Sequence, residues 1–346
     1  EVAFRIIERS FGRKKRKKYN TVVCGVKKLL PFVRALCGLL GIHCLPMEDA
    51  RTIVSETSKD NADSTPKCDI IIPVCDQFRH TKNCIESIIK NTDSPYRLIV
   101  INNGKDPETS NYIDGLHDEN GVQISVVHND KNLGWGRALN KGIELSSSPY
   151  VCFQNNDTVV TRGWLRKMIG ILRSREDFGL INPAWEGKPD DLSVGEYGLE
   201  LEKNMGRFVE TDWCRGFSVV AKRSVIDRIG GIDEVFGLAY FEDVDYSIRA
   251  IEAGFLCLKA LDTYVYHERN VTAFSVLKDD KWNELHERNK LICYKKWGVP
   301  LRIGVILGRG ACLSEATLGK IEDSVFYLAR KQHRVDIWSP KKLGRM

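Results

Sequence analysis

The sequence lacks any uninterrupted apolar run of the roughly 20 residues that a membrane-spanning helix needs. Its most apolar early segment, residues 21–45, is interrupted by three basic residues and a proline. No small-residue cleavage site follows a clean apolar core, so a secretory signal is not indicated either. The chain begins with Glu1, and we expect it to be an excised or processed piece of a longer protein.

Cysteine patterns that would hold a small fold together are also missing. The eleven cysteines are odd in number and irregularly spaced, and no Cys-x-x-Cys pair occurs. Neither a structural zinc site nor a disulfide framework is indicated, and we expect a reducing, cytoplasmic compartment. With 42% hydrophobic and 28% charged residues, the 346-residue chain has the composition of one large globular domain or two ordinary ones.

Positive charge is concentrated at one end of the chain. Residues 1–34 carry eleven Lys and Arg against two Glu. Their net charge of +9 (11 − 2) exceeds the net charge of +6 of the whole chain. A nucleic-acid-binding chain would usually spread this charge over its folded body, so we expect no nucleic-acid partner. The basic tract at residues 13–18 lies beside an amphipathic run, which favours peripheral contact with an anionic inner membrane face or with a partner protein. A solvated arm without a partner explains the tract equally well.

The chain divides into three parts by composition. Residues 1–66 are a helical basic leader followed by a polar linker, and residues 67–299 form the main domain. Residues 300–346 read as one β-α-β unit, which is too small to bury a core of its own. This extension resembles the start of a second domain of the two-Rossmann type, although a purely structural appendage is an alternative.

Strand and helix patterns alternate in the main domain. Continuous apolar strands are predicted at residues 69–74, 97–101, 123–128 and 150–154, and helices at 81–90 and 137–145. This alternation predicts right-handed β-α-β units in an open α/β sheet. Ligands bind at the carboxyl ends of the strands in such sheets, so the polar residues there are the first candidates for chemistry.

Two acidic segments stand out. Asp157 follows the strand at residues 150–154, where a carboxylate can reach a divalent cation that bridges a diphosphate. Glu242 and Asp243 precede a helix predicted at residues 246–253. Considered alone, each segment is better explained by capping of a turn or a helix.

A series of motifs occurs in a characteristic order. They lie at residues 71–76, 100–104, 132–142, 153–157, 213–217, 241–249 and 265–267. Together they resemble family 2 glycosyltransferases with the GT-A fold, over residues 68–298. The resemblance implies a Rossmann-like open mixed sheet flanked by helices. It also implies transfer of a sugar from a nucleoside-diphosphate sugar, with UDP or dTDP as the nucleotide.

The resemblance implies a metal site. Asp157 stands at the place of the family's Asp-x-Asp motif, and His267 matches a histidine that can complete the coordination. Manganese or magnesium would neutralise charge on the departing diphosphate. A hydrogen-bonded core histidine remains the alternative for His267.

The resemblance also implies a catalytic carboxylate, Asp243, which would accept the proton of the acceptor hydroxyl while the anomeric configuration inverts. Glu242 would contact the acceptor or the sugar. Asp245 and Arg249 are spaced for an ordinary helical ion pair.

Nucleotide and acceptor contacts follow from the same motifs. Asn102 stands where family members commonly carry a base-contacting Asp, and the Asn-Asn-Asp form of the metal motif is similar to members that transfer rhamnose. The implied nucleotide contacts are Pro73, Val74, Asp76, Asn102, Asn132, Arg137, Asn155 and Asn156. The implied acceptor contacts are Trp213, Arg215 and Gly216, with an ordinary core role open for Trp213.

The sequence therefore predicts an inverting, metal-dependent transferase that acts on a saccharide or lipid-linked acceptor in surface polysaccharide or glycolipid synthesis. Residues 184–212, which look loop-rich, would cover the site. A nucleotidyltransferase is one alternative, but residues 75–78 are not the Gly-rich basic motif that such enzymes usually carry. A catalytically dead nucleotide- or carbohydrate-binding module is the other.

Overall fold

The computed structural model describes residues 4–5, 67–117, 122–268, 279–306 and 315–338. The chain divides into two compact units, one formed by residues 49–293 and the other by residues 1–48 with 294–346. The expected helical leader and its linker lie outside the described residues, apart from the two-residue strand β1 (Phe4–Arg5). The larger unit contains the predicted α/β domain.

The larger unit alternates strands and helices as far as its middle. Its elements are β2 (Cys68–Val74), α3 (Phe78–Asn91), β3 (Tyr96–Asn102), α4 (Pro107–Asp114), β4 (Gln123–His128), α5 (Trp135–Leu145), β5 (Tyr150–Gln154), β6 (Thr158–Val160), α6 (Trp164–Arg173), β7 (Phe178–Ala184), α7 (Val194–Leu201), β8 (Phe208–Glu210), β9 (Ser218–Lys222), α8 (Arg223–Ile229), α9 (Glu242–Glu252), β10 (Leu256–His267) and α11 (Asp279–Trp297), whose last residues belong to the other unit.

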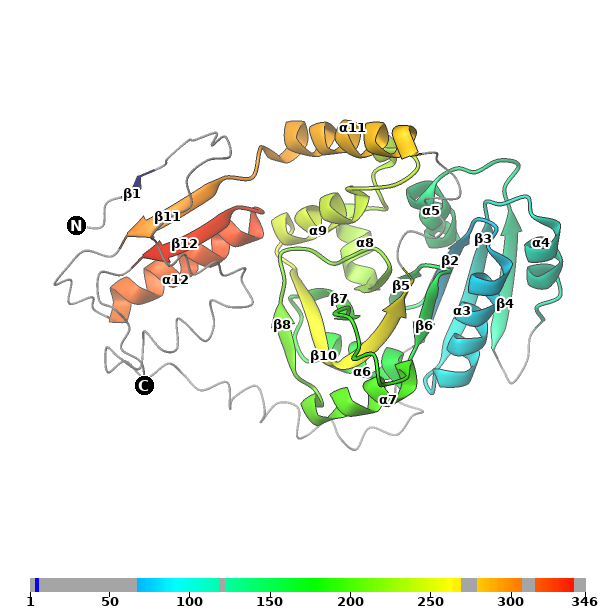
Figure 1. The fold of residues 1–346 in the computed structure, drawn as a ribbon. Coiled ribbons are helices and arrows are strands. Elements are labelled where there is room, and N and C mark those ends of the chain that lie inside the picture. The colour runs from blue at the N-terminus through cyan, green and yellow to red at the C-terminus, as the bar shows by residue number, and fades with distance from the viewer. Residues whose placement is uncertain (1–3, 6–66, 118–121, 269–278, 307–314, 339–346) are drawn as a thin grey trace. The chain divides into compact units, whose positions relative to one another are not determined.

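These strands form one mixed sheet, drawn in Figure 1. Its order is β4-β3-β2-β5-β9-β7-β10-β6, with β8 paired to β10. The strands β4, β3, β2 and β5 are mutually parallel, whereas β9 runs antiparallel between β5 and β7. The predicted open mixed α/β sheet flanked by helices is confirmed.

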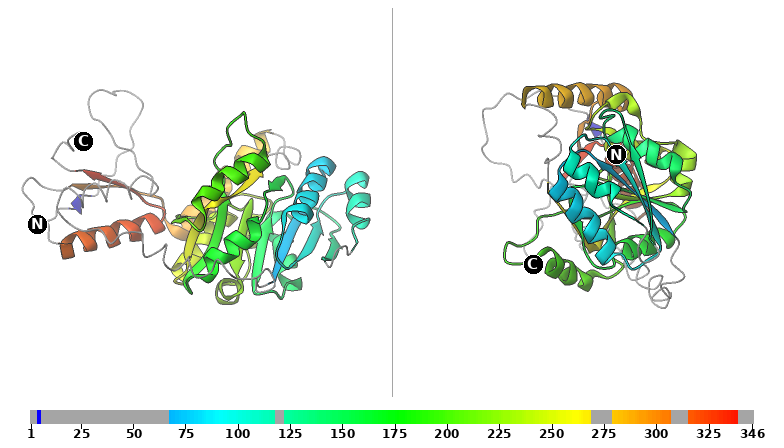
Figure 2. Two further views of the ribbon diagram at one scale, coloured as in Figure 1. Left: turned by 90° about the horizontal axis from the view of Figure 1, so that it is seen from below. Right: turned by 90° about the vertical axis from the view of Figure 1, so that its right-hand side faces the viewer.

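The sheet separates two apolar cores. Along β2, Ile70 and Ile72 point into one core and Ile71 into the other, as the alternation of strand side chains requires. Helices α3, α4 and α6 cover the first face, and α5, α8 and α9 cover the second (Figure 2). Burial on both faces explains why β2 reads as a continuous apolar run.

Close packing fixes α5 on the sheet. A Cβ atom on Gly142 would overlap the side chain of Ile71, so a glycine lets the helix approach β2. The start of α5 lies beside the end of β3, because Asn103 Nδ2 donates to the carbonyl of Gly134 at 3.2 Å.

Helix α9 begins earlier than predicted, at Glu242 instead of residue 246. Three acidic residues fall in its first turn, where negative charge is favourable to the helix dipole. Residues 184–212 are also less loop-rich than expected, because they contain α7 and β8.

The smaller unit contains the predicted C-terminal β-α-β extension. Strands β11 (Arg302–Ile306) and β12 (Arg334–Trp338) are parallel and are connected through α12 (Glu315–Arg330). Strand β1 pairs antiparallel with β11, so the two ends of the chain contribute to one three-stranded sheet.

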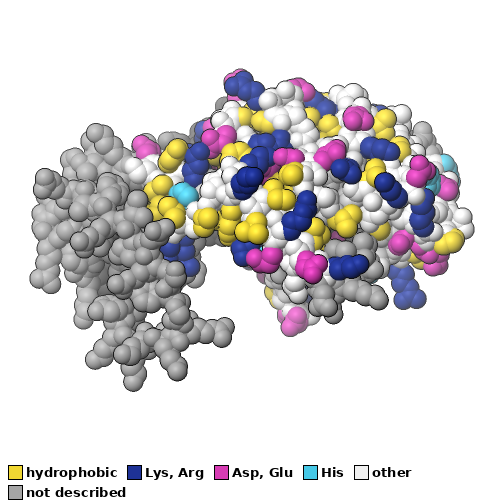
Figure 3. All heavy atoms as spheres, turned by 90° about the horizontal axis from the view of Figure 1, so that it is seen from above, with side chains coloured by type: hydrophobic (Ala, Val, Ile, Leu, Met, Phe, Trp, Pro, Cys, Tyr) yellow, Lys and Arg dark blue, Asp and Glu magenta, His cyan; other side chains and the backbone are white. Residues whose placement is uncertain are grey.

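Charges of both signs are interspersed on the face shown in Figure 3, where Lys and Arg side chains lie among Asp and Glu. Within the described ranges, no helix has the length and apolar character that crossing a bilayer requires.

Candidate active site

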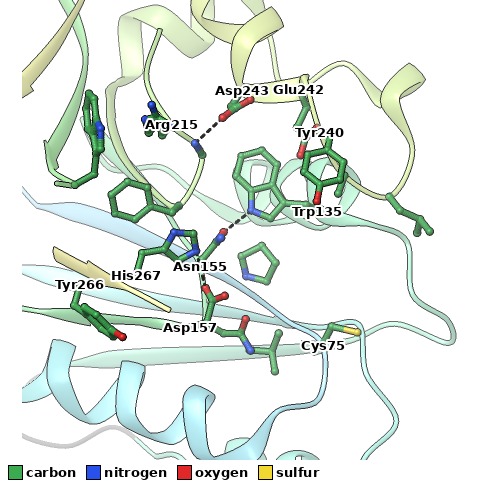
Figure 4. Close-up of a pocket in the computed structure, with 18 of the residues that line it drawn as sticks. Cys75, Trp135, Asn155, Asp157, Arg215, Tyr240, Glu242, Asp243, Tyr266 and His267 are labelled. Carbon is green, nitrogen blue, oxygen red and sulfur yellow. Dashed lines mark hydrogen bonds and ion pairs between the residues drawn. The ribbon is translucent and has the colours of Figure 1, made fainter. Parts of the chain in front are cut away.

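A cavity of about 920 Å³ opens at the carboxyl edge of the sheet. The ends of two parallel strands line it, through Pro73 and Val74 on β2 and through Asn155, Asn156 and Asp157 after β5. Asp243, at the start of α9, lines the same cavity. Two acids that lie far apart in the chain are therefore brought to one space (Figure 4).

Asp157 and His267 face each other across two paired strands. Strand β6 pairs antiparallel with β10 in a register that sets His267 opposite Thr158. The Nε2 atom of His267 lies 3.2 Å from Oδ1 of Asp157, and the His267 ring stacks on Phe217 with 4.9 Å between ring centroids. Asp157 is 6% exposed, and its Oδ1 atom accepts no hydrogen bond from the described residues.

This pair fits a divalent cation. An imidazole nitrogen and a carboxylate oxygen are both ordinary ligands of manganese, and an oxygen without a hydrogen bond is available to a metal. No cluster of three or more His, Cys, Asp or Glu that could hold a metal occurs among the described residues.

Asp243 is held by backbone N–H groups. Gly216 donates to its Oδ2 atom at 2.9 Å, and Val244 donates to its Oδ1 atom at 2.8 Å. Burial raises the pKa of Asp243, and these N–H groups together with Arg215 oppose the rise. A Cβ atom on Gly216 would lie 3.0 Å from the Trp135 ring and 3.3 Å from the Asp243 Cβ, so a glycine suits this close approach.

Glu242 is buried beside Asp243. Desolvation by burial, and then the Asp243 charge, raise the pKa of Glu242 to about 8, although backbone N–H groups oppose the rise. Farther along α9, Arg249 donates from Nε to Asp245 at 2.9 Å, and its guanidinium also donates to the carbonyls of Ile229 and Gly231. The predicted ion pair is confirmed, and it anchors the helix that carries the acids.

The asparagines after β5 are oriented by side chains from other elements. Trp135 Nε1 donates to Asn155 Oδ1 at 2.8 Å, as Figure 4 shows, and Asn156 Nδ2 donates to Thr81 Oγ1 at 2.9 Å. Asn132 also lines the cavity, where its Nδ2 contacts the sulfur of Cys75 at 3.4 Å.

Asn102 does not line the cavity. It is 2% exposed, and its Nδ2 atom lies 3.2 Å from both Ser110 Oγ and His128 Nδ1. Its Oδ1 atom accepts from Gly104 N at 2.9 Å. The amide is therefore occupied by bonds that hold the end of β3.

Asp76 and Arg137 are also outside the lining of the cavity. Asp76 Oδ1 accepts from the backbone N–H groups of Lys105 and Asp106 at 2.8 and 2.7 Å, which fixes the turn before α4. Arg137 is exposed and forms an ion pair with Glu234 at 3.0 Å. Each side chain has a structural partner in place of the expected diphosphate or ribose.

Arg215 lies between two indole rings. Its guanidinium carbon is 4.9 Å from the ring centroid of Trp185 and 5.2 Å from that of Trp213. Arg215 and Gly216 line the cavity with Trp185, whereas Trp213 contacts Arg215 from outside the lining.

Several aromatic side chains that line the cavity were not among the predicted site residues. Trp135, Trp185, Tyr240, Tyr266 and Trp282 all line the cavity. Trp135 and Tyr266 lie within the ordered motifs and Tyr240 directly precedes one, whereas Trp185 and Trp282 lie outside them; an aromatic side chain alone does not distinguish a cavity wall from a packed core.

Comparison with known proteins identifies the family of the central part of the chain. Residues 69–211 match the sequence model described as Glycosyl transferase family 2. These residues belong to glycosyl transferase family 2. The predicted resemblance to family 2 is confirmed, whereas the similarity to members that transfer rhamnose stays a prediction. The matched stretch of this family 2 domain contains Asp157 and ends before Asp243 and His267.

Curated relatives of the family 2 domain are moderately similar. The pre-mycofactocin glycosyltransferase of Mycobacterium tuberculosis is 26% identical over 198 residues, which cover 54% of this chain and 39% of that protein. The uncharacterized glycosyltransferase YibD of Escherichia coli is 33% identical over 153 residues, or 44% of each chain. The O-antigen biosynthesis protein RfbC of Myxococcus xanthus is 24% identical over 63% of this chain and 19% of that protein. This chain thus spans less than half the length of these relatives.

Two solved structures are distantly similar to this chain. The mannosyltransferase PcManGT from Pyrobaculum calidifontis, in complex with GDP-Man and Mn2+, has a TM-score of 0.49 and 15% identity over 70% of both chains. Residues 1–349 of S. aureus TarS, in complex with UDP-GlcNAc, have a TM-score of 0.49 and 14% identity over 78% of this chain and 74% of that one.

Proposed function

We propose that this protein transfers a sugar from a nucleoside-diphosphate sugar to a hydroxyl of a saccharide or lipid-linked acceptor, with inversion at the anomeric carbon. The observation that carries the proposal is that Asp157, His267 and Asp243 line one cavity. Membership of residues 69–211 in glycosyl transferase family 2 supports transfer of a sugar rather than transfer of a nucleotidyl group. A role in surface polysaccharide or glycolipid synthesis is part of the proposal.

Asp157 and His267 would hold a manganese or magnesium ion, with a neutral imidazole as the second ligand. When bound, the ion supplies positive charge that stabilises the departing nucleoside diphosphate. Phe217 keeps the His267 ring in its present plane by stacking on it. Asn155 and Asn156 are held beside the pair and would contact the diphosphate or the sugar.

Asp243 would act as the base. The oxygen of the acceptor hydroxyl forms a bond to the anomeric carbon, the bond from that carbon to the diphosphate oxygen breaks, and the hydroxyl proton passes to the Asp243 carboxylate. A carboxylate whose pKa is raised toward the working pH is a stronger base, and burial raises the pKa of Asp243 in this way. Each of its oxygens keeps a lone pair after accepting one N–H.

The nucleotide, UDP or dTDP, would lie against the ends of β2 and β5. Pro73, Val74 and Asn132 line this part of the cavity. The buried hydrogen bonds of Asn102 favour an indirect role in which it holds the backbone that the base contacts. Arg215 and Gly216 would lie on the acceptor side.

The test combines Asp243→Asn with a matched control, Asp191→Asn, on an exposed acid outside the lining of the cavity. Transfer from a panel of UDP- and dTDP-sugars to mixed oligosaccharide acceptors is followed as release of the nucleoside diphosphate. We expect loss of general-base catalysis to lower turnover about 10²–10⁴-fold in Asp243→Asn, with the Kd for UDP and manganese within about twofold of wild type. Turnover that survives the change refutes the base assignment.

A second arm addresses the metal. His267→Ala and Asp157→Asn should abolish the manganese dependence of nucleotide binding measured by calorimetry, whereas Asp191→Asn should retain it. Nucleotide binding by wild type without any turnover would instead support the binding-module alternative. Peripheral membrane contact through the basic leader stays a prediction, which sedimentation with anionic liposomes at low and high salt would test.

A further inference from the structure

Trp135 occupies the middle of the cavity wall. It is the first residue of α5, it is partly buried against the core on that face of the sheet, and it lines the cavity. In Figure 4 it lies between the side of the cavity that holds Asp157 and the side that holds Asp243. One side chain is therefore in a position to act on both halves of the site.

The backbone at Trp135 is held in place. Its N–H donates to the carbonyl of Leu238 at 3.0 Å, and the N–H of the preceding Gly134 donates to Asn132 Oδ1 at 2.8 Å. Gly134 has a φ of 85°, and a Cβ atom there would lie 2.5 Å from the carbonyl oxygen of Gly237. Because the backbone is fixed, the indole has only the few directions that its rotamers allow.

The nitrogen end of the indole orients Asn155. Trp135 Nε1 donates to Asn155 Oδ1 at 2.8 Å. An indole N–H can only donate, so the amide oxygen faces it and the Nδ2 group is left for another partner. No residue that the structure describes accepts a hydrogen bond from this Nδ2, and Asn155 lines the cavity. An N–H donor in the cavity suits the oxygens of a diphosphate, which are acceptors only.

The backbone of Asn155 is fixed independently of Trp135. Its N–H donates to the carbonyl of Phe217 at 2.8 Å, and its carbonyl accepts from Thr158 Oγ1 at 2.7 Å. Loss of the indole bond should therefore free the Asn155 amide to rotate without moving the loop that carries it.

The other end of the indole packs on Gly216. A Cβ atom at Gly216 would lie 3.0 Å from both Cζ2 and Cη2 of the Trp135 ring. Gly216 N donates to Asp243 Oδ2 at 2.9 Å, and this bond opposes the rise in the pKa of Asp243 that burial causes. The outer ring of the indole therefore supports the peptide group that holds the Asp243 carboxylate.

We propose that Trp135 is a positioning residue that acts at both ends of its indole. The N–H turns the Asn155 amide so that its donors serve the diphosphate of the sugar donor, and the outer ring keeps the Gly216 N–H on Asp243. This inference rests on the proposed function. An ordinary wall residue would contribute packing alone, and the experiment distinguishes the two roles.

Two replacements separate the ends of the indole. Benzothienylalanine at position 135 keeps both fused rings but has sulfur in place of the N–H, so it removes only the bond to Asn155. Trp135→Phe removes the N–H and the outer ring together. Trp164→Phe is the matched control, because Trp164 is fully buried on α6 and its Nε1 donates to Thr92 Oγ1 at 2.9 Å, outside the lining of the cavity.

The first readout is the Kd of the full chain for UDP in the presence of manganese, measured by calorimetry. An amide that rotates freely binds the diphosphate less tightly, and the loss of about one hydrogen bond corresponds to a roughly three- to tenfold rise in Kd. We expect this rise for benzothienylalanine and for Trp135→Phe. Trp164→Phe should stay within about twofold of wild type, although its Tm falls.

The second readout is the pH profile of nucleoside diphosphate release from UDP- and dTDP-sugars. A weaker bond from Gly216 should raise the pKa of Asp243, and a base acts only when it is deprotonated. The acid limb of kcat/KM should therefore move to higher pH by about 0.5–1 pH unit in Trp135→Phe. Glu242 and Arg215, the charged neighbours of Asp243, are unchanged in every variant. Benzothienylalanine and Trp164→Phe should keep the wild-type profile.

Three results would overturn the inference. They are wild-type UDP binding or a wild-type pH profile in Trp135→Phe, a pH profile that benzothienylalanine shifts as far as phenylalanine does, or the same losses in Trp164→Phe, which would indicate a general loss of stability. Benzothienylalanine keeps the shape of the indole, so the nitrogen end is tested even where Trp135→Phe does not fold. The proposed function fails separately, if wild type binds neither UDP nor dTDP and releases neither.

Discussion

Replacing Asn289 by alanine tests how the segment before α9 is held in place. Asn289 lies on α11 and is fully buried, and its Nδ2 atom is 2.7, 2.6 and 3.2 Å from the carbonyl oxygens of Phe236, Ala239 and Tyr240. Its Oδ1 atom accepts from Arg288 at 2.8 Å. One amide therefore fastens the loop that leads into the acids of α9.

The expected loss of stability follows from those hydrogen bonds. A net hydrogen bond contributes about 1 kcal/mol and a buried carbonyl without a donor costs about 1–3 kcal/mol, so we expect Asn289→Ala to lower the free energy of unfolding by about 2–4 kcal/mol. For a unit of this size that corresponds to a Tm lower by roughly 5–15 °C. Release of the left-handed Tyr240 and Phe241 (φ of 77° and 70°) should also displace Asp243 and lower turnover at least tenfold at temperatures where the variant is folded.

The assay pairs thermal denaturation with turnover for Asn289→Ala, Asn289→Asp and Glu284→Ala. The aspartate keeps the side-chain shape but replaces the donor by a carboxylate oxygen, so it should be at least as destabilising as alanine. Glu284 is exposed on the same helix, so Glu284→Ala should change neither the Tm nor turnover. A Tm within 2 °C of wild type for Asn289→Asp, with full turnover, would refute the idea that this amide holds the loop.

Three further changes test the surrounding structure. Gly216→Ala places a Cβ 3.0 Å from the Trp135 ring, so turnover should fall at least tenfold while the Tm changes by less than about 4 °C; unchanged turnover argues against tight packing there. The pKa of Glu242 is raised in the folded state, so the folded protein binds more protons and wild type should lose stability as pH rises from about 4.5 to about 8. Urea titrations of Glu242→Gln should show a smaller loss of stability over this range, since the raised pKa of Asp243 still contributes, and identical slopes would contradict the raised pKa of Glu242. Arg97→Ala removes the ion pair at 3.0 Å from the fully buried Asp69 carboxylate, which keeps the backbone N–H groups of Ser147 and Ser148, and should cost about 3 kcal/mol in urea unfolding; a loss below about 1 kcal/mol would be inconsistent with a buried pair.

The predicted sheet agrees with the structure where local pattern is decisive. Strands β4 and β5 occupy the predicted residues, because apolar runs bounded by polar turns fix both ends. Helix α9 begins four residues before the prediction, at Glu242, because acids in a first turn read equally as a loop or as a helix start. The antiparallel insertion of β9 between β5 and β7 depends on long-range pairing that no local signal records.

The site was predictable where a residue follows a strand directly. Asp157 was predicted in this way, since strand ends share one edge of the sheet, whereas Val74 was implied only by the family resemblance. Asn102 also follows that rule, but His128 and Ser110 occupy its amide, and such competition between partners is invisible in a single sequence. Trp282 was missed because α11 returns to the cavity from a part of the chain that carries no motif.

The register between β6 and β10 also bears on how the protein matures. Thr158 and His267 are paired although they lie far apart in the sequence, and we expect such distant contacts to form late because closing the long loop loses entropy first. A nascent or truncated chain that ends before β10 would thus have Asp157 without its imidazole. If Asp157 and His267 hold the proposed manganese ion, manganese-dependent retention on immobilised nucleotide would select chains in which β10 has paired with β6, and would separate them from folding intermediates during purification.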